Sequence, residues 1–393
     1  MTQELVIAGG GIGGLAAALA ADRAGWQARV FEQATAFSEV GAGVQMGPNA
    51  TQALRALGRL EAVKSLACVP ERLVARDALE GRELGVLPLG HDFEARYGAP
   101  YFTVHRADLH AVLLQGLQGT EVILRTDKRI ATAEDRGSGV RVSLSDGTLC
   151  EGDALVGADG LWSAVRPALA ADGPPRPSRH VAYRALIPMA NLPARWHAPE
   201  ISAWLGPQLH AVTYPVRGGA LLNVVCVVEQ RIEGPQRGWD LPGTADRLHA
   251  ALGLVFDPLQ ALVDAAPAWG LWVLHDRAPV SSPHEMARGR IALLGDAAHP
   301  MRPYLAQGVA MALEDAVELG RCLAAVSDRI VDTETALQRY ALNRWPRVAR
   351  VQRRSRRNGE IFHASGLVRL ARDLVMRAAG GARVMDLPWL YGH

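Results

Sequence analysis

The sequence predicts an α/β protein in which a Rossmann-like domain is interrupted by an inserted antiparallel β-sheet and followed by a C-terminal helical segment. Three observations support this prediction. The chain opens with a buried strand, a glycine-rich turn, an Ala/Leu-rich helix and a second strand, the order that builds a parallel sheet. Short β-rich runs separated by Pro and Gly occupy residues 181–230, which favours antiparallel pairing. From Thr333 onward the pattern is helical.

Apolar runs and their boundaries predict the elements in order along the chain. Strands are expected at residues 5–8, 28–31, 181–189, 201–205, 210–216, 221–228 and 290–295. Helices are expected at residues 15–24, where Gly25 provides a stop signal, and at residues 308–325. We therefore expect a discontinuous Rossmann-like domain at residues 1–75, 100–180 and 277–330, a β-sheet domain at residues 76–99 and 181–276, and a helical segment at residues 331–393.

Composition excludes several classes of partner. The 42 Lys and Arg nearly balance the 40 Asp and Glu in the 393 residues, so no nucleic-acid partner is expected. The longest apolar stretch, residues 7–21, is shorter than the roughly 20 residues of a membrane span, and no signal peptide is expected. The four cysteines form no C-x-x-C pair, and no His, Cys or carboxylate cluster has metal-ligand spacing. We therefore expect reduced thiols, no membrane partner, no metal and a cytoplasmic location.

A glycine motif follows the first strand. Gly9, Gly11 and Gly14 match G-x-G-x-x-G, which allows a tight turn, close approach of the backbone to a pyrophosphate, and close helix–strand packing. The helix that follows presents free N–H groups to the anion. Glu32 ends the second strand, where a carboxylate can bind a ribose diol. Because the motif occurs once, the chain either uses NAD as a substrate or holds one flavin and meets nicotinamide transiently.

Two further segments each contain a strand that ends in a turn with Gly and Asp. Residues 153–166 have the sequence DALVGADGLWSAVR, and residues 290–308 have the sequence RIALLGDAAHPMRPYLAQG. Together with the glycine motif, in this order, they resemble the three motifs of the single-component FAD-dependent aromatic hydroxylases, the para-hydroxybenzoate hydroxylase family. The resemblance covers nearly the whole chain, and within the family the pattern is most similar to 6-hydroxynicotinate 3-monooxygenase and salicylate hydroxylase.

The resemblance implies one FAD and assigns roles to particular residues. Asp296 would bind ribityl or ribose hydroxyls, and the helix that opens at Gly308 and Val309 would face the N1–C2=O edge of the flavin. Arg106 would reach the phosphate or ribityl side, and Lys128 the adenine. The expected FAD contacts are Gly9, Gly11, Ile12, Gly13, Gly14, Glu32, Gln33, Val44, Gln45, Arg106, Lys128, Asp159, Gly295, Asp296, Gly308 and Val309. For Asp159, a role as a simple turn former stays open.

The resemblance also implies the reaction. NADH or NADPH would reduce the flavin as a transient co-substrate, and O₂ would add at flavin C4a to give a hydroperoxide. This species would hydroxylate a small hydroxylated aromatic or N-heteroaromatic carboxylate. A phenolate reacts better than a phenol, so a side chain that accepts the hydroxyl proton is useful. The hydroxylated position, accompanying decarboxylation, the choice between NADH and NADPH and a homodimer stay open.

The expected catalytic residues are His210 and Tyr214. They stand at i and i+4 of an expected strand, so both point to the same face, and the resemblance matches them to a His and a Tyr that line the aromatic pocket. The expected substrate contacts are Gln45, Arg184, His210, Tyr214, Pro300 and Arg302, with Arg184 or Arg302 pairing with a carboxylate. The resemblance to 6-hydroxynicotinate 3-monooxygenase matches Gln45 to a histidine of that enzyme, and an amide cannot titrate, so the exact substrate stays open.

Two other functions stay open on the sequence alone. An NAD-dependent dehydrogenase would use the single glycine motif but would lack the segment with Gly295 and Asp296. A non-catalytic FAD-binding module that senses redox state would carry the same motifs; it would be yellow but would oxidise no nicotinamide with any phenolic acid. Separately, seven arginines between residues 344 and 357 are spaced as on the polar side of a surface helix, and we interpret them as a solvated face.

Overall fold

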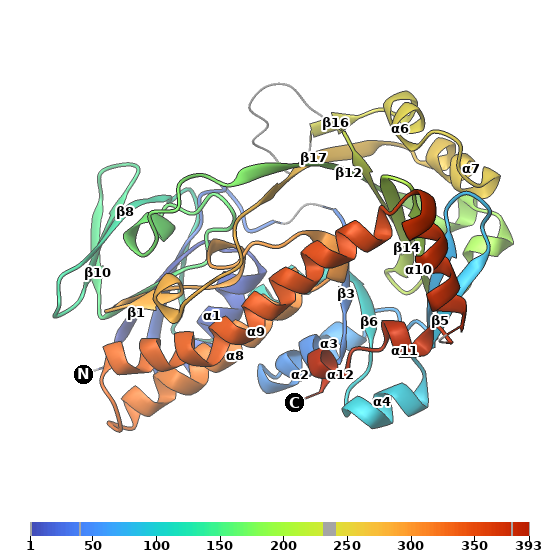
Figure 1. The fold of residues 1–393 in the computed structure, drawn as a ribbon. Helices are drawn as coiled ribbons and strands as arrows, with labels where there is room; N and C mark the ends of the chain where they lie inside the picture. Colours follow the sequence, from blue (N-terminus) through green and yellow to red (C-terminus); the bar gives the residue numbers. More distant parts are fainter. Residues whose placement is uncertain (1, 39–40, 231–240, 379, 393) are drawn as a thin grey trace.

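The computed structural model describes residues 2–38, 41–230, 241–378 and 380–392. Figure 1 shows the long helix α9 (Thr333–Phe362) running diagonally across the molecule, from the end that carries β1 to the end that carries α10. Within the described ranges, none of the helices combines the length and the apolar character that a membrane span requires.

A six-stranded sheet forms the Rossmann-like part, with the strand order β18-β19-β11-β1-β2-β7. Its strands are β1 (Glu4–Ala8), β2 (Gln27–Phe31), β7 (Ile123–Arg125), β11 (Ala154–Gly157), β18 (Ala287–Arg288) and β19 (Ile291–Leu293). All pairs are parallel except β18 with β19. Helices α1 (Ile12–Arg23) and α8 (Gly308–Ser327) pack so closely that a Cβ on Gly320 of α8 would lie only 2.8 Å from the Cβ of Ala20. The predicted opening of strand, helix and strand is confirmed.

An eight-stranded sheet forms the second half, with the order β16-β17-β12-β15-β14-β13-β4-β5. Its strands are β4 (Arg72–Asp77), β5 (Glu83–Pro88), β12 (Arg176–Pro188), β13 (Glu200–Gly206), β14 (Leu209–Val216), β15 (Leu221–Glu229), β16 (Leu241–Gly243) and β17 (Trp269–Asp276). The predicted antiparallel pairing is confirmed, with one exception, the parallel pair of β13 and β4. The proposed domain boundaries themselves stay a prediction.

The remaining elements connect or cover these sheets. Two small sheets pair β3 (Gly43–Met46) with β6 (Phe102–His105), and β9 (Val140–Leu144) with β8 (Ile130–Asp135) and β10 (Leu149–Gly152). The other α-helices are α2 (Pro48–Ala56), α3 (Leu60–Lys64), α4 (His91–Tyr97), α5 (Arg106–Gln115), α6 (Ala245–Leu252), α7 (Asp257–Ala265), α10 (Gly366–Ala378), α11 (Ala382–Met385) and α12 (Pro388–Tyr391). The 3₁₀ helices are η1 (Arg166–Ala168), η2 (Met189–Asn191), η3 (Ala194–Trp196), η4 (Pro283–Glu285), η5 (Gly295–Ala297) and η6 (Pro303–Leu305).

Between β11 and β12, a stretch that the structure describes in full, the chain forms only the short 3₁₀ helix η1 and no α-helix. Pro167 stands inside this element and cannot donate a backbone hydrogen bond, and the Ser163 hydroxyl accepts the N–H groups of Val165 and Arg166. The local side-chain bonds therefore build a tight turn in place of an α-helix.

The two faces of the eight-stranded sheet bury different side chains. Along β14, Leu209 and Ala211 belong to a core that includes Leu248 of α6 and Leu259 of α7. His210 and Tyr214 alternate with them and therefore point to the opposite face. That face carries the side chains discussed below.

The arginines of α9 do not all form the solvated face that their spacing suggested. Arg344 is buried against α8, where it donates to the carboxylates of Glu314 and Asp315 at 2.7 Å each. Arg347 also bonds to Glu314, and to the carbonyl of Leu390. The interpretation was wrong for these two residues, because a buried carboxylate on a neighbouring helix outweighs the usual exposure of arginine.

Candidate active site

The carboxyl ends of the parallel strands meet at one edge of the six-stranded sheet. There the Gly9 N–H donates to the Phe31 carbonyl, and the Ala158 N–H donates to the Ala8 carbonyl, both at 2.8 Å. These bonds hold together the turns that follow β1, β2 and β11. Open parallel sheets bind ligands at this edge, so the predicted motifs converge where a nucleotide would lie.

The glycine turn has the shape that the motif predicts. Gly9 has φ +98°, and a Cβ on it would lie 2.5 Å from the carbonyl oxygen of Ala158. A Cβ on Gly14 would collide with the carbonyl oxygen of Gly9, and one on Gly13 would lie 2.7 Å from the Leu294 side chain. Helix α1 begins at Ile12 after the N-cap Gly11, without a side-chain cap, so its first N–H groups are available to an anion.

Glu32 is held at the end of β2 by its own neighbours. Its two carboxylate oxygens accept the N–H groups of Gly10 and Ala34, at 2.6 and 2.8 Å. Each oxygen keeps a further lone pair that can accept a ribose hydroxyl. Gln33, the next residue, is exposed. Lys128 lies beside Glu32, because its N–H donates to the Glu32 carbonyl, while its ammonium pairs with Asp146 at 2.5 Å.

Asp159 caps its own turn and also keeps an unused acceptor. Oδ2 accepts the N–H groups of Ala164 and Val165, at 2.7 and 3.3 Å. Oδ1 is buried and has no hydrogen-bond partner in the described part of the chain. Burial raises the pKa of this carboxyl. A buried acceptor without a partner is costly, so Oδ1 fits a ligand that donates a hydrogen bond.

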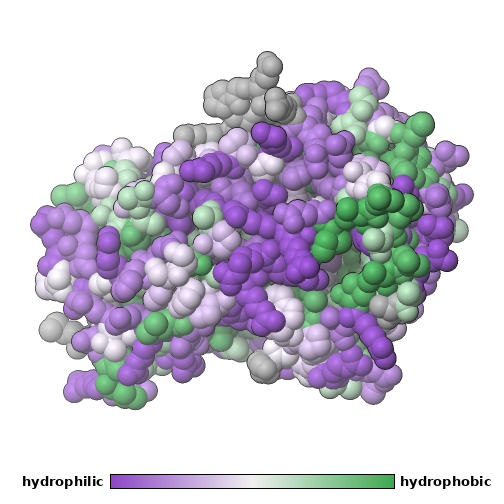
Figure 2. All heavy atoms as spheres, viewed as in Figure 1, coloured by the Kyte–Doolittle hydropathy of each residue, from purple (hydrophilic) through white to green (hydrophobic). Residues whose placement is uncertain are grey.

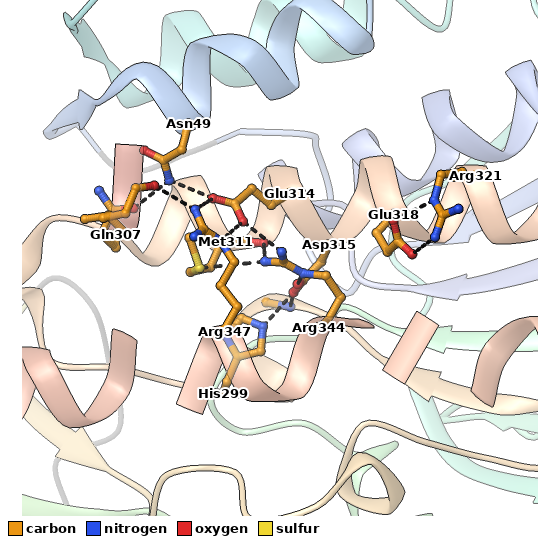
Figure 3. A network of polar contacts seen from close by, with 12 residues as sticks. Asn49, His299, Gln307, Met311, Glu314, Asp315, Glu318, Arg321, Arg344 and Arg347 are labelled. Carbon is orange, nitrogen blue, oxygen red and sulfur yellow. Dashed lines mark hydrogen bonds and ion pairs between the residues drawn. The ribbon is translucent and has the colours of Figure 1, made fainter. Parts of the chain in front are cut away.

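A buried carboxylate positions the turn that follows β19 (Figure 3). Oδ2 of Asp315 on α8 accepts the Gly295 N–H at 3.0 Å and contacts Nε2 of His299 at 2.6 Å. Oδ1 accepts from Nε of Arg344 at 2.7 Å. Burial opposes ionisation of Asp315, but His299 and Arg344 outweigh it and lower its pKa to about 2. Gly295, with φ +59°, and Asp296 are therefore held at the edge of the sheet.

The start of α8 is held by a neighbouring network (Figure 3). Nδ2 of Asn49 donates to Oε1 of Gln307, the N-cap of α8, at 2.8 Å and to Oε1 of Glu314 at 2.7 Å. The N-cap makes no side-chain cap bond, so the N–H groups of Gly308 and Val309 open an uncapped helix end. A helix N-terminus of this kind stabilises negative charge, as the anionic form of a reduced flavin requires.

The strand registers show which side chains share the inner face of the eight-stranded sheet. Directly opposite residues in antiparallel strands point to the same face. His210 pairs with Val227, which pairs with Ala182. The next rows are Val212, Val225 and Arg184, and then Tyr214, Asn223 and Leu186. The prediction that His210 and Tyr214 share a face is confirmed, and Arg184 lies on the same face two strands away.

Strand β3 joins this face to the nucleotide edge. The Gly43 N–H donates to Oδ1 of Asn223 at 2.7 Å, and a Cβ on Gly43 would collide with the Tyr214 ring. Val44 and Gln45 follow on the same strand, and Oε1 of Gln45 accepts the Tyr101 hydroxyl at 3.0 Å. The backbone of β3 can lie so close to the sheet only because Gly43 has no side chain.

His210 is buried and bonded to a residue that the sequence did not single out. Its Nδ1 lies 2.7 Å from Nε2 of His363, the residue that caps the end of α9. The rings of Tyr304 and Phe362 pack against it, with centroids 5.1 and 5.4 Å away. Burial, and then the charges of His363 and His180, keep the pKa of His210 well below its ordinary value. No sequence spacing could have paired His210 with His363, because 153 residues separate them.

The other residues expected to contact substrate or FAD have different neighbours within the protein. Arg184 is buried, and its guanidinium lies 5.1 Å from the centroid of the Trp272 ring. Arg302 already donates to Asp276 at 3.0 Å. The carbonyl of Pro300 accepts from Gln352 of α9. Arg106 opens helix α5 directly after β6.

These features fit FAD. The glycine turn leaves no room for side chains, two helix N-termini lack side-chain caps, and the unpartnered Oδ1 of Asp159 lies at the same edge as Glu32. The fold and the site thus define a flavin-binding α/β protein with a second sheet beside the cofactor edge.

Comparison with known proteins agrees. A model of the FAD-binding domain family matches residues 2–355. The 3-hydroxybenzoate 6-hydroxylase of Polaromonas naphthalenivorans (strain CJ2) is 38% identical over 393 residues, covering 99% of this chain and 95% of the relative. The 6-hydroxynicotinate 3-monooxygenase of Bordetella bronchiseptica is 35% identical over 362 residues, covering 90% and 91%. The solved structure of Klebsiella pneumoniae HpxO complexed with FAD and uric acid has a TM-score of 0.85 and 26% identity, covering 99% of this chain and 96% of that chain.

The chain therefore belongs to the FAD-binding domain family and, within it, to the FAD-dependent aromatic hydroxylases. The family resemblance predicted from the three motifs is confirmed, as are FAD as the cofactor and a monooxygenase as the class of enzyme. Membership decides against an NAD-dependent dehydrogenase.

Replacing Asp296 with Ala is expected to weaken FAD binding about 10- to 100-fold, because a hydrogen bond from a hydroxyl to a carboxylate contributes about 1.5–3 kcal/mol. The dissociation constant can be measured by titrating apoprotein with FAD. Asp264→Ala, which removes a carboxylate that is 67% exposed, is the matched control. Equal FAD affinity in Asp296→Ala and wild type would exclude this residue from the cofactor site.

Replacing Asp315 with Asn is expected to lower the free energy of unfolding by about 3–5 kcal/mol, because Arg344 would be left as a buried charge with too few partners. The double variant Asp315→Leu, Arg344→Met is expected to lose less free energy of unfolding than the sum of the losses in the single variants Asp315→Leu and Arg344→Met. Urea unfolding of the FAD-loaded variants measures both. Arg321→Met, which breaks the exposed pair of Arg321 with Glu318, is the control and is expected to cost less than about 1 kcal/mol. Simple additivity in the double variant would contradict the coupling.

Proposed function

We propose that this protein hydroxylates a small hydroxylated aromatic or N-heteroaromatic carboxylate, with NAD(P)H as reductant and O₂ as co-substrate. The observation that carries the proposal is the inner face of the eight-stranded sheet. There a buried imidazole and a buried guanidinium lie on strands two places apart, beside the strand that leads to the cofactor edge. Bound FAD, once reduced, supplies the activation of O₂, and the residues of the chain bind and orient the ring.

Arg184 is the residue we propose to bind the substrate carboxylate. Two strand spacings, about 10 Å, separate its strand from that of His210, so one aromatic ring fits between the two side chains. A guanidinium offers two parallel N–H donors to a carboxylate, and the Trp272 ring supports its plane. Arg302, whose guanidinium pairs with Asp276, is the second candidate.

His210 is the residue we propose to accept the proton of the ring hydroxyl, with Tyr214 orienting the ring. Burial first of all lowers the pKa of His210, so the imidazole is neutral at neutral pH and has a ring nitrogen that can accept a hydrogen bond from the ring hydroxyl. Its neighbours Val212, Val225 and Val227 are apolar and exclude water, which protects reactive oxygen chemistry from side reactions.

The remaining site residues keep the roles expected from the sequence. We propose that FAD is held by Gly9, Gly11, Ile12, Gly13, Gly14, Glu32, Gln33, Val44, Gln45, Arg106, Lys128, Asp159, Gly295, Asp296, Gly308 and Val309. The substrate would contact Gln45, Arg184, His210, Tyr214, Pro300 and Arg302. The part of the chain that comprises residues 76–99 and 181–276 would act as the substrate domain. We also infer a cytoplasmic location, since NAD(P)H is the reductant and the four cysteines are free.

The test is a screen of NADH and NADPH oxidation over hydroxybenzoates and hydroxypyridine carboxylates, with chromatography of the products. At least one compound is expected to give a hydroxylated product and to accelerate flavin reduction in stopped-flow traces. Peroxide release without a hydroxylated product would count as uncoupled oxidation. A yellow protein that oxidises neither nucleotide with any compound would support the non-catalytic FAD-binding module.

His210→Ala is expected to lower the single-turnover rate of hydroxylation by about 10²-fold, because a proton acceptor next to the ring is lost. Tyr214→Phe is expected to weaken substrate binding by about 1 kcal/mol, the value of one hydrogen bond. Both should keep the FAD affinity of the wild type. Tyr183→Phe, on the opposite face of the same sheet, is the control. Full product yield and unchanged substrate affinity in both variants would remove these residues from the site.

Arg184→Met is expected to raise the KM of the best carboxylated substrate at least about tenfold, since the loss of a charge-assisted hydrogen bond costs about 1.5–3 kcal/mol. The KM of the same ring without its carboxylate should change much less. Arg302→Met, which removes a guanidinium paired with Asp276, is the comparison variant and is expected to have the smaller effect on both compounds. Steady-state assays of the four combinations measure the difference. Equal increases for both compounds would contradict a carboxylate site at Arg184.

We further propose that the enzyme is a homodimer whose interface includes α10. Five aliphatic side chains of this one helix are more than half exposed, and Figure 2 shows a hydrophobic area over the same part of the surface. They are Leu367, Val368, Leu370, Leu374 and Val375. A contiguous patch of this kind on a monomer commonly marks a protein interface.

Light scattering of the wild type is expected to give twice the 42.1 kDa of the chain, and Leu374→Glu is expected to shift it toward the monomer. A buried charge at an apolar interface has no partner and is expensive. Leu254→Glu, at a leucine that is 93% exposed outside α10, should leave the mass unchanged. A monomeric wild type would refute the dimer.

A further inference from the structure

The end of helix α9 inserts a second imidazole behind His210. Nε2 of His363 lies 2.7 Å from Nδ1 of His210, and Nδ1 of His363 lies 3.6 Å from Oε1 of Glu229. Nε2 of His180 lies 3.7 Å from the same carboxylate oxygen. His210, His363 and Glu229 therefore form a row that starts at Nδ1 of His210, and His180 lies beside the last two members of this row.

Exposure rises along this row of side chains. His210 is 2% exposed, the His363 side chain 3%, and the Glu229 side chain 43%. Glu229 is the last residue of β15 and reaches solvent at the end of the sheet. The row thus leads from the buried face of the sheet to water.

We propose that His363 and Glu229 carry the hydroxyl proton of the substrate from His210 to solvent. This inference rests on the proposed function, in which His210 accepts that proton. It makes His363 a relay residue, which contacts His210 and not the substrate.

The transfer balances atom by atom. The substrate O–H bond breaks and an N–H bond forms at Nε2 of His210. The Nδ1–H of His210 moves to Nε2 of His363, the Nδ1–H of His363 moves to the carboxylate of Glu229, and Glu229 releases a proton to water. The net result is a bound phenolate and one proton in solvent, with no oxidation or reduction. When the product takes a proton back from Nε2 of His210, the same path runs in reverse and restores both tautomers.

The two steps of the proton transfer, from His210 to His363 and from His363 to Glu229, span different distances. The 2.7 Å between the imidazoles is a hydrogen-bond distance. The 3.6 Å between His363 and Glu229 is too long for a direct bond, so a small side-chain rotation or one bridging water completes it. Nδ1 of His363 is buried and has no hydrogen-bond partner among the described residues, so the nitrogen that would hand on the proton is uncommitted.

His363 is held in place by the hairpin that carries His210. Its carbonyl accepts the N–H of Gln208, in the turn between β13 and β14, at 3.0 Å. The pair of imidazoles is therefore positioned by backbone bonds, and the end of α9 cannot drift away from β14 without losing this contact.

The surroundings favour release of the proton over its retention. Burial, and then His180, Arg302 and Arg372, lower the pKa of His363 to about 3. Burial also lowers the pKa of His180, followed by the charge of Arg302. A second proton is therefore unstable on either ring, and the half-exposed carboxylate of Glu229 is the only anionic group within 4 Å of these imidazoles in the described part of the chain.

The test follows proton release when oxidised, FAD-loaded enzyme binds substrate. The enzyme is mixed with 3-hydroxybenzoate in weak buffer that contains a pH indicator, and with the best compound of the screen if that differs. Phenolate absorbance of the bound ring is recorded at the same time. The wild type is expected to release close to one proton as the phenolate forms. His363→Gln is expected to slow this release at least about tenfold, because an amide can bond to His210 but cannot pass a proton through its two ends.

Further variants separate a relay from a structural role. Glu229→Gln should slow release as well, and added imidazole should partly restore release in His363→Ala. His249→Gln, a histidine of α6 on the outer side of the sheet, is the matched control and should behave as the wild type. Flavin absorbance and melting temperature report folding, and Glu229→Gln carries the test if His363→Gln loses FAD.

Release at the wild-type rate in both His363→Gln and Glu229→Gln would overturn the relay. So would a wild type that hydroxylates its substrate but releases no proton on binding, an outcome that leaves the proposed function intact. Loss of proton release from the wild type after treatment with a chelator would assign His180, Glu229 and His363 to a metal ion, and would also overturn the relay. A wild type that forms no hydroxylated product with any compound would instead refute the proposed function.

Discussion

The cofactor side of this molecule depends on one buried carboxylate. Asp315 is fully buried, and a charge in that position is stable only with good partners. Its partners are the Gly295 N–H, His299 and Arg344, which come from the turn after β19, the loop beyond it and helix α9. The turn that carries Asp296, the start of α8 and the C-terminal helical segment are therefore held by the same side chain. The position of the flavin-binding turn is coupled to the packing of the chain terminus.

Helix α9 extends this coupling along the loop between the two halves. Side chains of Gln352, Ser355 and Asn358 donate to the carbonyls of every second residue of this loop, Pro300, Arg302 and Tyr304, at 3.0, 2.6 and 3.1 Å. Arg344 in the first half of the helix bonds to Asp315, which holds the cofactor turn, and His363 just beyond the C-terminal end lies against His210. Because one rigid helix makes all of these contacts, the loop that follows the Gly–Asp turn is held at defined distances from both the cofactor edge and the inner face of the sheet.

The pleat of the eight-stranded sheet arranges the proposed substrate groups. Alternation along each strand sends apolar residues such as Leu209 to the core with α6 and α7, and sends His210, Tyr214 and Arg184 to the inner face. A shift of one residue in the register would move every one of these side chains to the wrong side. The close approach of Gly43 to Tyr214 and Asn223 adds the cofactor strand β3 to that face. The inner face of the sheet and the cofactor strand are thus joined by a side-chain hydrogen bond and by close packing at Gly43.

The sequence alone determined the order of elements, the glycine turn, the family and the shared face of His210 and Tyr214, because these depend on residues close together in the chain. Strand alternation places i and i+4 on one face, and a glycine motif between a strand and a helix builds a phosphate-binding turn wherever it occurs. Only the tertiary structure decided that Arg344 is buried, that Arg302 already pairs with Asp276, and that His363 stands behind His210. These pairings join segments far apart in the chain, and they depend on strand register and helix packing, which leave no local pattern in a single sequence.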